Sequence, residues 1–157
     1  TLDACGDDDP VVPEIMIPLV SAKREVELVK TRIDAIAAAV KTERGREFDY
    51  RLGVMVETPR AALRAEEIAP HCEFFSFGTN DLTQMTYGLS RDDAGRFMSP
   101  YVQQGVFPED PFHTLDQEGV GALLRLGAER ERRAQTGLTL SVCGEHSGSP
   151  ASIAFCR

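Results

Sequence analysis

Residues 52–81 read LGVMVETPRAALRAEEIAPHCEFFSFGTND, and this stretch decides the expected fold. Its two apolar runs, residues 52–57 and 74–77, have the length and composition of buried parallel strands. Between them Thr58-Pro59 is a typical helix start, with threonine as the cap and proline in the first turn, and the predicted helix covers residues 60–69. A strand, a helix and a second strand at this spacing predict a βαβ unit and therefore a parallel sheet.

The same alternation continues on both sides of this unit. Apolar residues recur at steps of three and four in two more segments, which predicts helices, and two more short apolar runs predict strands. A segment rich in Gly and Pro, which extends to about Leu115, reads as irregular. The remaining elements, in chain order, are a strand at 14–20, a helix from the cap Ser21 to about residue 42 with Gly45 at its end, a helix at 119–135 and a strand at 138–142.

Four parallel strands are too few to close a (β/α)₈ barrel, which takes about 250 residues. The fold class is therefore α/β, and we expect residues 1–157 to form one domain, about half of such a barrel and incomplete at both ends. In a barrel or in an open parallel sheet, functional sites lie at the carboxyl ends of the strands.

Composition excludes several classes of function. The net charge of −8 argues against nucleic-acid binding, which depends on clustered Lys and Arg. No apolar run approaches the ~18 to 20 residues of a membrane span, and the first residues resemble no signal peptide. Without a secretory signal we expect a cytoplasmic protein with reduced thiols. A zinc site is not expected, because no CxxC pair occurs among the four cysteines, Cys5, Cys72, Cys143 and Cys156.

Polar side chains stand at the carboxyl ends of three predicted strands. Glu57 ends one strand, Asp81 follows the next, and the two are 24 residues apart, about one strand-helix-strand repeat. Two carboxylates at one edge of a sheet suit Mg²⁺, which prefers oxygen ligands and keeps several waters. The alternatives are that Glu57 caps the following helix while Asp81 supports its own loop, or that the pair acts as a glycosidase-type acid and base.

Gly78-Thr79-Asn80, directly before Asp81, favours a ligand cradle. Gly78 allows a ligand to approach the backbone, and Thr79 and Asn80 supply donors for phosphate or carboxylate oxygens. Cys143 follows the last strand, where a thiol can pack as a small apolar group or transfer a proton. His146 could tune that thiol or simply bond to backbone, and a Cys/His hydrolase lacks a third orienting residue.

Several stretches, in order, resemble the phosphoenolpyruvate (PEP)-binding barrel of PEP-utilising enzymes. The resemblance covers nearly everything from residue 14 to residue 157, and its flanking motifs are most similar to those of the pyruvate, phosphate dikinases. The stretches that carry it are EIMIPLV (14–20), VMVETPRAAL (54–63), FFSFGTNDLTQM (74–85) and VCGEHSGSP (142–150), with the dikinase-like SRDDAG (90–95), DQEGVG (116–121) and CGEH (143–146).

This resemblance implies a phosphotransferase segment that interconverts pyruvate and PEP with Mg²⁺. The phosphoryl group would come from a phosphohistidine on a swivelling domain, and ATP and inorganic phosphate would be used through a further nucleotide-binding domain, in an enzyme expected to be a homodimer. Carried over by position, Glu57 and Asp81 would hold Mg²⁺. The substrate would meet Glu57, Gly78, Thr79, Asn80 and Asp81, and Cys143 would give a proton to the enolate carbon.

The resemblance also places substrate-clamping arginines on earlier barrel strands and the last strand after Arg157. We therefore expect the isolated chain to be inactive. Two other interpretations stay open at this point. One is a PEP synthase, which would not require inorganic phosphate, and the other is a non-catalytic remnant that binds a partner through its sheet edge. A plastid or another organelle is an alternative to the cytoplasm.

Overall fold

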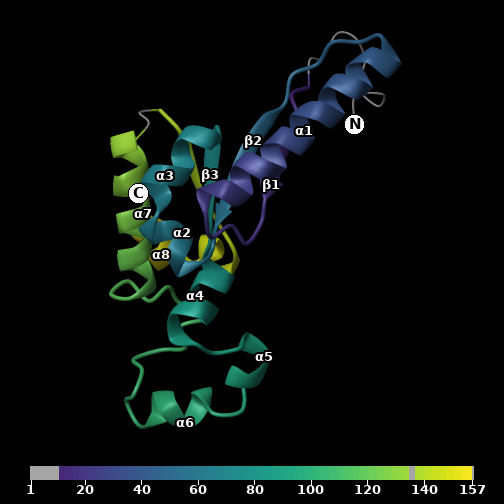
Figure 1. Cartoon of the computed structure of the whole chain (residues 1–157). Helices are drawn as coiled ribbons and strands as arrows, with labels where there is room; N and C mark the ends of the chain where they lie inside the picture. Colours follow the sequence, from purple (N-terminus) through teal and green to yellow (C-terminus); the bar gives the residue numbers. More distant parts are fainter. Residues whose placement is uncertain (1–10, 135–136, 157) are drawn as a thin grey trace.

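A four-stranded parallel sheet organises the chain in the computed structural model, which describes residues 11–134 and 137–156. The strands are adjacent in chain order, β1-β2-β3-β4, as successive βαβ units require. Their bounds are β1 (Glu14–Ile17), β2 (Arg51–Val56), β3 (Phe74–Gly78) and β4 (Thr139–Cys143). Within the described residues the sheet is open, and this confirms the expected fold class, a parallel α/β sheet consistent with part of a barrel (Figure 1).

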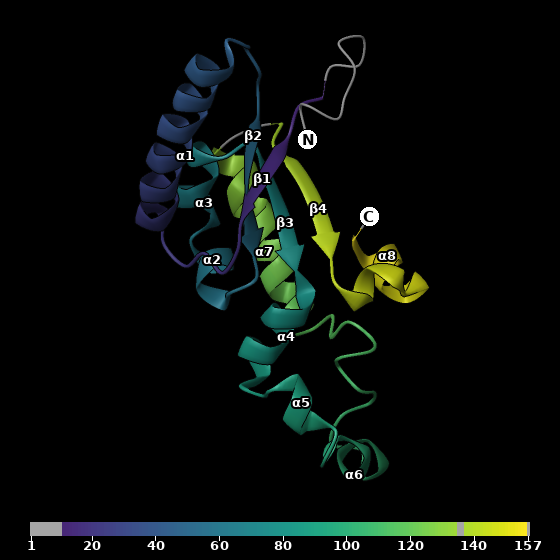
Figure 2. The same ribbon diagram turned by 90° about the vertical axis from the view of Figure 1, so that its right-hand side faces the viewer.

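Helices cover one face of the sheet (Figure 2). The apolar side chains of alternate strand positions point into this layer, and Val54, Val56 and Phe75 have no exposed surface there. The long helices are α1 (Lys23–Arg44), α4 (Thr79–Tyr87) and α7 (Val120–Ala134). The short ones are α2 (Pro59–Leu63), α3 (Ala65–Ile68), α5 (Arg91–Ala94), α6 (Met98–Gln103) and α8 (Pro150–Cys156), with 3₁₀ turns η2 (Ala69–His71) and η3 (Glu145–Gly148).

Arg51 joins all four strands at their amino-terminal ends. Its guanidinium pairs with Glu14 at 2.7 Å and with Glu73 at 3.9 Å, and it donates to Thr139 Oγ1 at 3.3 Å. These residues lie at the starts of β1, β3 and β4, so one side chain from β2 reaches every other strand. The cluster is partly exposed, and its contribution to the free energy of unfolding is therefore small for each pair.

Two helix boundaries differ from the sequence prediction. The first long helix begins at Lys23 with Ala22 as its cap, rather than at a Ser21 cap, because Glu25 accepts hydrogen bonds from the N–H groups of Ser21 and Ala22 at 2.7 and 2.9 Å. The helix predicted at 60–69 is broken into α2, α3 and η2. The predicted cap Thr58 is confirmed, because its Oγ1 accepts from the Ala61 N–H at 3.0 Å.

The predicted apolar face of α1 is packed only in part. Val26 is buried, whereas Ile36 is 63% exposed. The 22-residue helix is about 33 Å long and the four-residue strand β1 only about 13 Å, so the helix extends past the sheet (Figure 1). Its predicted end is confirmed, since Gly45 adopts a left-handed conformation with φ of 60°.

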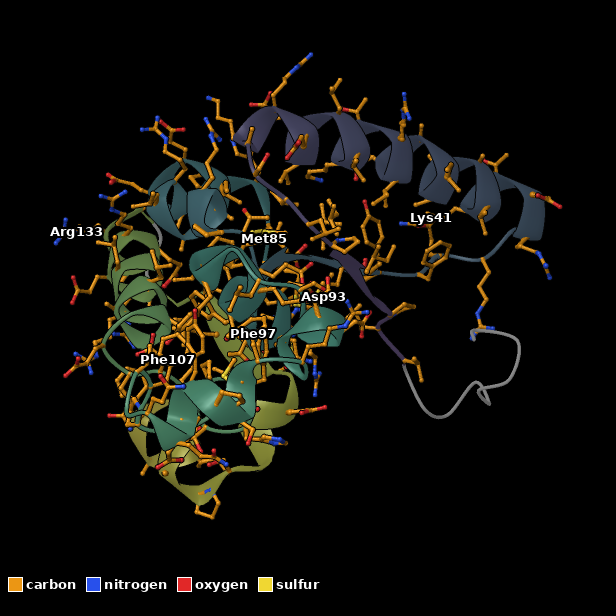
Figure 3. The ribbon with its side chains drawn as sticks, turned by 90° about the horizontal axis from the view of Figure 1, so that it is seen from below. Lys41, Met85, Asp93, Phe97, Phe107 and Arg133 are labelled. Atoms are coloured by element: carbon orange, nitrogen blue, oxygen red, sulfur yellow. The ribbon has the colours of Figure 1, made fainter. Side chains whose placement is uncertain are left out.

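The stretch predicted to be irregular is partly helical. Helix α4 starts directly at Thr79, and α5 and α6 follow within a lobe that we define as residues 88–115. The lobe has its own small core, built on Ala94, Met98 and Phe112. It lies beyond the carboxyl ends of the strands, nearest the viewer in Figure 3, where Phe97 and Phe107 are labelled.

Two further findings concern expectations from composition. In residues 11–134 and 137–156, no helix combines the length and apolar character that a bilayer crossing needs. Cys72, Cys143 and Cys156 are free thiols, and Cys5 lies outside the described residues.

A glutamate occupies a core position of α7. The buried stripe of this helix runs through Val120, Leu124 and Gly127 to Glu131, at steps of four, three and four. Glu131 is 1% exposed, and among the described residues neither of its carboxylate oxygens has a hydrogen-bond partner. Burial raises the pKa of this carboxyl, and the smaller effect of Arg132 lowers it.

The raised pKa of Glu131 makes the stability of the fold depend on pH. The folded state holds a proton that the unfolded state releases near pH ~4.3, so the free energy of unfolding falls as pH rises toward the folded-state pKa. We expect Glu131→Leu to remove this loss and to raise stability at pH 8 by about 1 kcal/mol or more. Urea unfolding at pH 5 and pH 8 measures it, with exposed Glu129→Leu as the control. Equal pH dependence in the two variants would contradict the prediction.

Candidate active site

The register of the sheet places the site residues at one height. Val56 pairs with Phe77, and Phe77 with Val142, so that Gly78 lies opposite Cys143. Glu57, which follows Val56, is therefore level with them at the carboxyl edge of the sheet. Because side chains alternate along a strand, Gly78 and Cys143 lie on the face of the sheet opposite to Phe77 and Val142.

Glu57 is buried and held in one orientation. It is 6% exposed, and its Oε1 accepts a hydrogen bond from the Leu19 N–H at 2.7 Å. Leu19 has a φ of 51°, a left-handed conformation that is uncommon for this residue type. A Cβ at Gly78 would lie 2.6 Å from Glu57 Oε2, so glycine is required for the carboxylate to take this place.

Asp81 lies beside Glu57, in the first turn of α4. Its Oδ1 accepts a hydrogen bond from Gln84 Nε2 at 3.2 Å. Burial raises the pKa of the Glu57 carboxyl, the Leu19 N–H lowers it, and the charge and hydrogen bonding of Asp81 raise it again. The charge of Asp81 therefore acts on Glu57, and the structure places both carboxyl groups at the carboxyl edge of the sheet, as the 24-residue spacing predicts.

The Gly78–Asn80 segment is engaged by the turn that follows β4. Thr79 is fully buried and its Oγ1 donates to the Cys143 carbonyl at 2.9 Å, so the hydroxyl points into the protein. Asn80 Oδ1 accepts from the Glu145 N–H at 3.2 Å. Of the expected donors, the Asn80 amide nitrogen and the first-turn N–H groups of α4 are therefore better placed for a ligand than the Thr79 hydroxyl.

Cys143 lies half-buried on the same face of the sheet. Its Sγ donates to the Phe77 carbonyl at 3.6 Å and lies 3.4 Å from Met55 Sδ. A Cβ at Gly78 would lie 3.1 Å from the same Met55 sulfur. The two ring nitrogens of His146 bond to Thr79 and to the Pro111 carbonyl, which agrees with the alternative that this histidine bonds to backbone.

Sequence reasoning missed three residues of this site. Leu19 orients Glu57, Met55 packs against the thiol, and Arg91 forms an ion pair with Glu145. Arg91 stands in the stretch that was expected to be irregular, and its only signal was a charged residue inside the SRDDAG motif. Its N–H also donates to Gln84 Oε1 at 2.9 Å, which links it to the partner of Asp81.

The chemical capacity of the site follows from these groups. A carboxylate pair can hold a divalent cation or a shared proton, and a thiol at the same edge can give a proton to a carbon acid. In the described part of the chain, no three His, Cys, Asp or Glu side chains converge as a metal cluster. Any cation here would therefore keep several ligands from water or substrate, as Mg²⁺ commonly does.

Comparisons with known proteins point to one family. Residues 9–157 match the family model described as the PEP-utilising enzyme, PEP-binding domain. The chain is 58% identical over 147 residues to the pyruvate, phosphate dikinase of Rhizobium meliloti (strain 1021), covering 94% of this chain and 16% of that enzyme. It is 51% identical over 147 residues to the dikinase of Clostridium symbiosum, covering 94% of this chain and 17% of that enzyme. It is 53% identical over 145 residues to the chloroplastic dikinase of Flaveria pringlei, covering 92% of this chain and 15% of that enzyme. The chain thus spans about a sixth of these relatives.

The contact between the two carboxyl groups gives a direct prediction. We expect Asp81→Asn to lower the pKa of Glu57 in metal-free buffer, because it removes the negative charge that favours the protonated form. Nuclear magnetic resonance titration of the Glu57 side-chain carboxyl measures this value. Asp93→Asn, at an exposed position of helix α5, is the control. A Glu57 pKa that is unchanged in Asp81→Asn would show that the carboxyl groups do not interact.

Proposed function

This chain belongs to the family of PEP-utilising enzymes, and we propose that its strand-end site binds pyruvate and PEP and carries out their interconversion as part of a pyruvate, phosphate dikinase. The observation that supports this most is that Glu57 and Cys143 lie at one edge of the sheet, where Asp81 stands in the first turn of the helix that follows Gly78. The relatives named above are dikinases, which favours this activity over PEP synthase.

We assign Glu57 and Asp81 as the ligands of Mg²⁺. The donor set fits, because both are carboxylates and one oxygen of each is fixed by the protein, through the Leu19 N–H and Gln84 Nε2. Burial and the nearby charge of Asp81 both raise the pKa of Glu57, and a divalent cation bound here would offset that charge. When bound, the ion would stabilise the negative charge of the enolate oxygen.

The substrate would lie against Glu57 and the Gly78–Asp81 segment. The Asn80 amide and the first-turn N–H groups of α4 can donate to the carboxylate or phosphoryl oxygens of the ligand. Gly78 leaves space for Glu57, whose carboxylate fills the position that a side chain at residue 78 would take. Thr79 acts through position, because its hydroxyl fixes the Cys143 carbonyl.

Cys143 would be the proton donor in the direction that forms pyruvate. After PEP gives its phosphoryl group to the histidine of another domain, the enolate of pyruvate remains. The carbon–hydrogen bond of the new methyl group forms as the S–H bond of Cys143 breaks, and water then returns a proton to the thiolate. The thiol is held by the Phe77 carbonyl, on the face that carries Glu57.

The wider assembly is also a proposal. It includes the phosphohistidine and nucleotide-binding domains, use of ATP and inorganic phosphate, and a homodimer. The location is proposed to be cytoplasmic, with the plastid as the alternative, because one relative is named as chloroplastic. The inactivity expected of the isolated chain stays a prediction. A non-catalytic binding remnant is the competing interpretation, and cation binding separates the two because a remnant need not bind a cation.

The metal assignment can be tested on this chain with Mn²⁺ as a spectroscopic substitute for Mg²⁺. We expect Glu57→Gln and Asp81→Asn each to weaken Mn²⁺ binding at least about tenfold, because each removes one of two charged ligands. Electron paramagnetic resonance titration measures free Mn²⁺. Glu73→Gln is the matched control, since Glu73 is a partly exposed carboxylate at the opposite end of the sheet. Equal Mn²⁺ affinities in all four proteins would refute the site.

The role of Cys143 can be tested in a chimera in which this chain replaces the matching 147-residue segment of the Rhizobium meliloti dikinase. We expect Cys143→Ser to slow pyruvate formation from PEP at least about 100-fold, while phosphoryl exchange on the remote histidine continues. Cys156→Ser, which alters an exposed thiol, is the control. Exchange of the pyruvate methyl protons at the normal rate in Cys143→Ser would disprove proton transfer by this residue.

A further inference from the structure

His146 is buried between three segments that are distant in the sequence. Its side chain belongs to η3, is 1% exposed, and has a partner at each ring nitrogen. Nδ1 lies 2.8 Å from Thr79 Oγ1, and Nε2 lies 2.9 Å from the Pro111 carbonyl. A carbonyl only accepts, so Nε2 carries a hydrogen and donates it to Pro111.

The hydroxyl of Thr79 connects this ring to Cys143. Thr79 Oγ1 lies within hydrogen-bond distance of both the Cys143 carbonyl and His146 Nδ1, and because the hydroxyl has one hydrogen it donates to one of these two acceptors at a time. The ring therefore reaches the backbone of Cys143 through one side chain, without touching the sulfur. Gly144 permits this arrangement, because a Cβ there would lie 2.6 Å from Thr79 Oγ1, and its φ of 100° is left-handed.

The lobe of residues 88–115 is tied to the same turn at both of its ends. Near its start, Arg91 pairs with Glu145, and near its end the Pro111 carbonyl accepts from His146. Glu145 and His146 are consecutive, and they follow Cys143 by two and three residues. The only chain between the thiol and these two anchors is thus Gly144, which by itself would be the most flexible residue possible.

From these contacts we infer that His146 is a positioning residue for Cys143: it locks the Cys143–His146 turn to Thr79 and to the lobe, and so fixes the thiol relative to Glu57 and Asp81. The effect of His146 on catalysis rests on the proposed function, whereas the locking of the Cys143–His146 turn rests on the hydrogen bonds alone. Hydrogen bonds among buried polar groups rigidify the segments that they join.

Three variants separate the two links of the ring. In His146→Asn the amide lies where Nδ1 was, which keeps the partner of Thr79 and loses the Pro111 donor. In His146→Gln the amide reaches the position of Nε2, which keeps the Pro111 donor and loses the Thr79 partner. His146→Leu fills similar space and loses both, and so reports what packing alone contributes.

The first measurement is made on this chain and does not depend on catalysis. Peptide-resolved alkylation with iodoacetamide reports the reactivity of each thiol, and exposed Cys156 is the internal control. We expect His146→Leu and His146→Gln to raise the alkylation rate of Cys143 at least about fivefold, because the turn opens locally, while His146→Asn stays within about twofold of the original chain. The Cys156 rate should not change.

The second measurement uses the chimera with the Rhizobium meliloti dikinase. We expect His146→Leu and His146→Gln to lower kcat for pyruvate formation from PEP about 10-fold to 100-fold with little change in KM, because misplacing a catalytic group affects the chemical step and the carboxylate pair is held by other contacts. His146→Asn should restore most of the rate.

The results have separate meanings. Equal alkylation of Cys143 in all four chains overturns the inference, and so does an Asn variant as reactive as the Leu variant. If His146→Leu does not fold, the difference in Cys143 alkylation rate between His146→Asn and His146→Gln is sufficient to test the inference. If the unsubstituted chimera forms no pyruvate, the proposed function fails, and the alkylation order still confirms or refutes the lock on the Cys143 turn.

Discussion

The parallel pairing of β2, β3 and β4 is the constraint on which the site depends. Because Val56, Phe77 and Val142 pair at one level, the next residue of each strand reaches the carboxyl edge together. Alternation of side chains then sends the apolar residues into the helix layer and the functional ones to the open face. A shift of one residue in any strand would exchange these faces, so the buried apolar residues that fix the register also fix the chemistry.

Glycines make close approaches possible both within the sheet and at its carboxyl edge. Gly53 leaves the space in which the Phe74 ring lies, Gly78 leaves space for the Glu57 carboxylate, and Gly144 leaves space for the Thr79 hydroxyl. Each glycine increases the conformational entropy lost on folding, and this loss is offset by contacts that no larger residue would allow. Thr79 is hydrogen-bonded to the Cys143 carbonyl at the end of β4 and to His146. His146 in turn bonds to the Pro111 carbonyl, so the lobe is linked to the ends of β3 and β4.

Glu57 and Glu131 are both buried carboxylates, but their surroundings differ. The pKa values of Glu57 and Glu131 are both raised by burial, but only Glu57 has a hydrogen bond from the backbone and a second carboxyl beside it. A carboxylate pair is unfavourable without a cation and becomes favourable when one binds, which is suited to a metal-dependent site. Glu131 has no such partner in the described residues, and so it only lowers stability as pH rises.

Local sequence patterns were enough to predict the parallel sheet and its strands, the helix cap at Thr58, the helix end at Gly45 and the placement of Glu57 and Asp81 at one edge. These patterns are apolar runs, capping residues and the repeat length of a βαβ unit. Other features depend on long-range packing: the break between α2 and α3, the exposed half of α1, the helices of the lobe, and the partners of Glu57 and His146. Contacts such as Leu19 with Glu57, 38 residues apart, and Thr79 with His146, 67 apart, leave no trace in local periodicity, because they depend on which segments the folded sheet brings together.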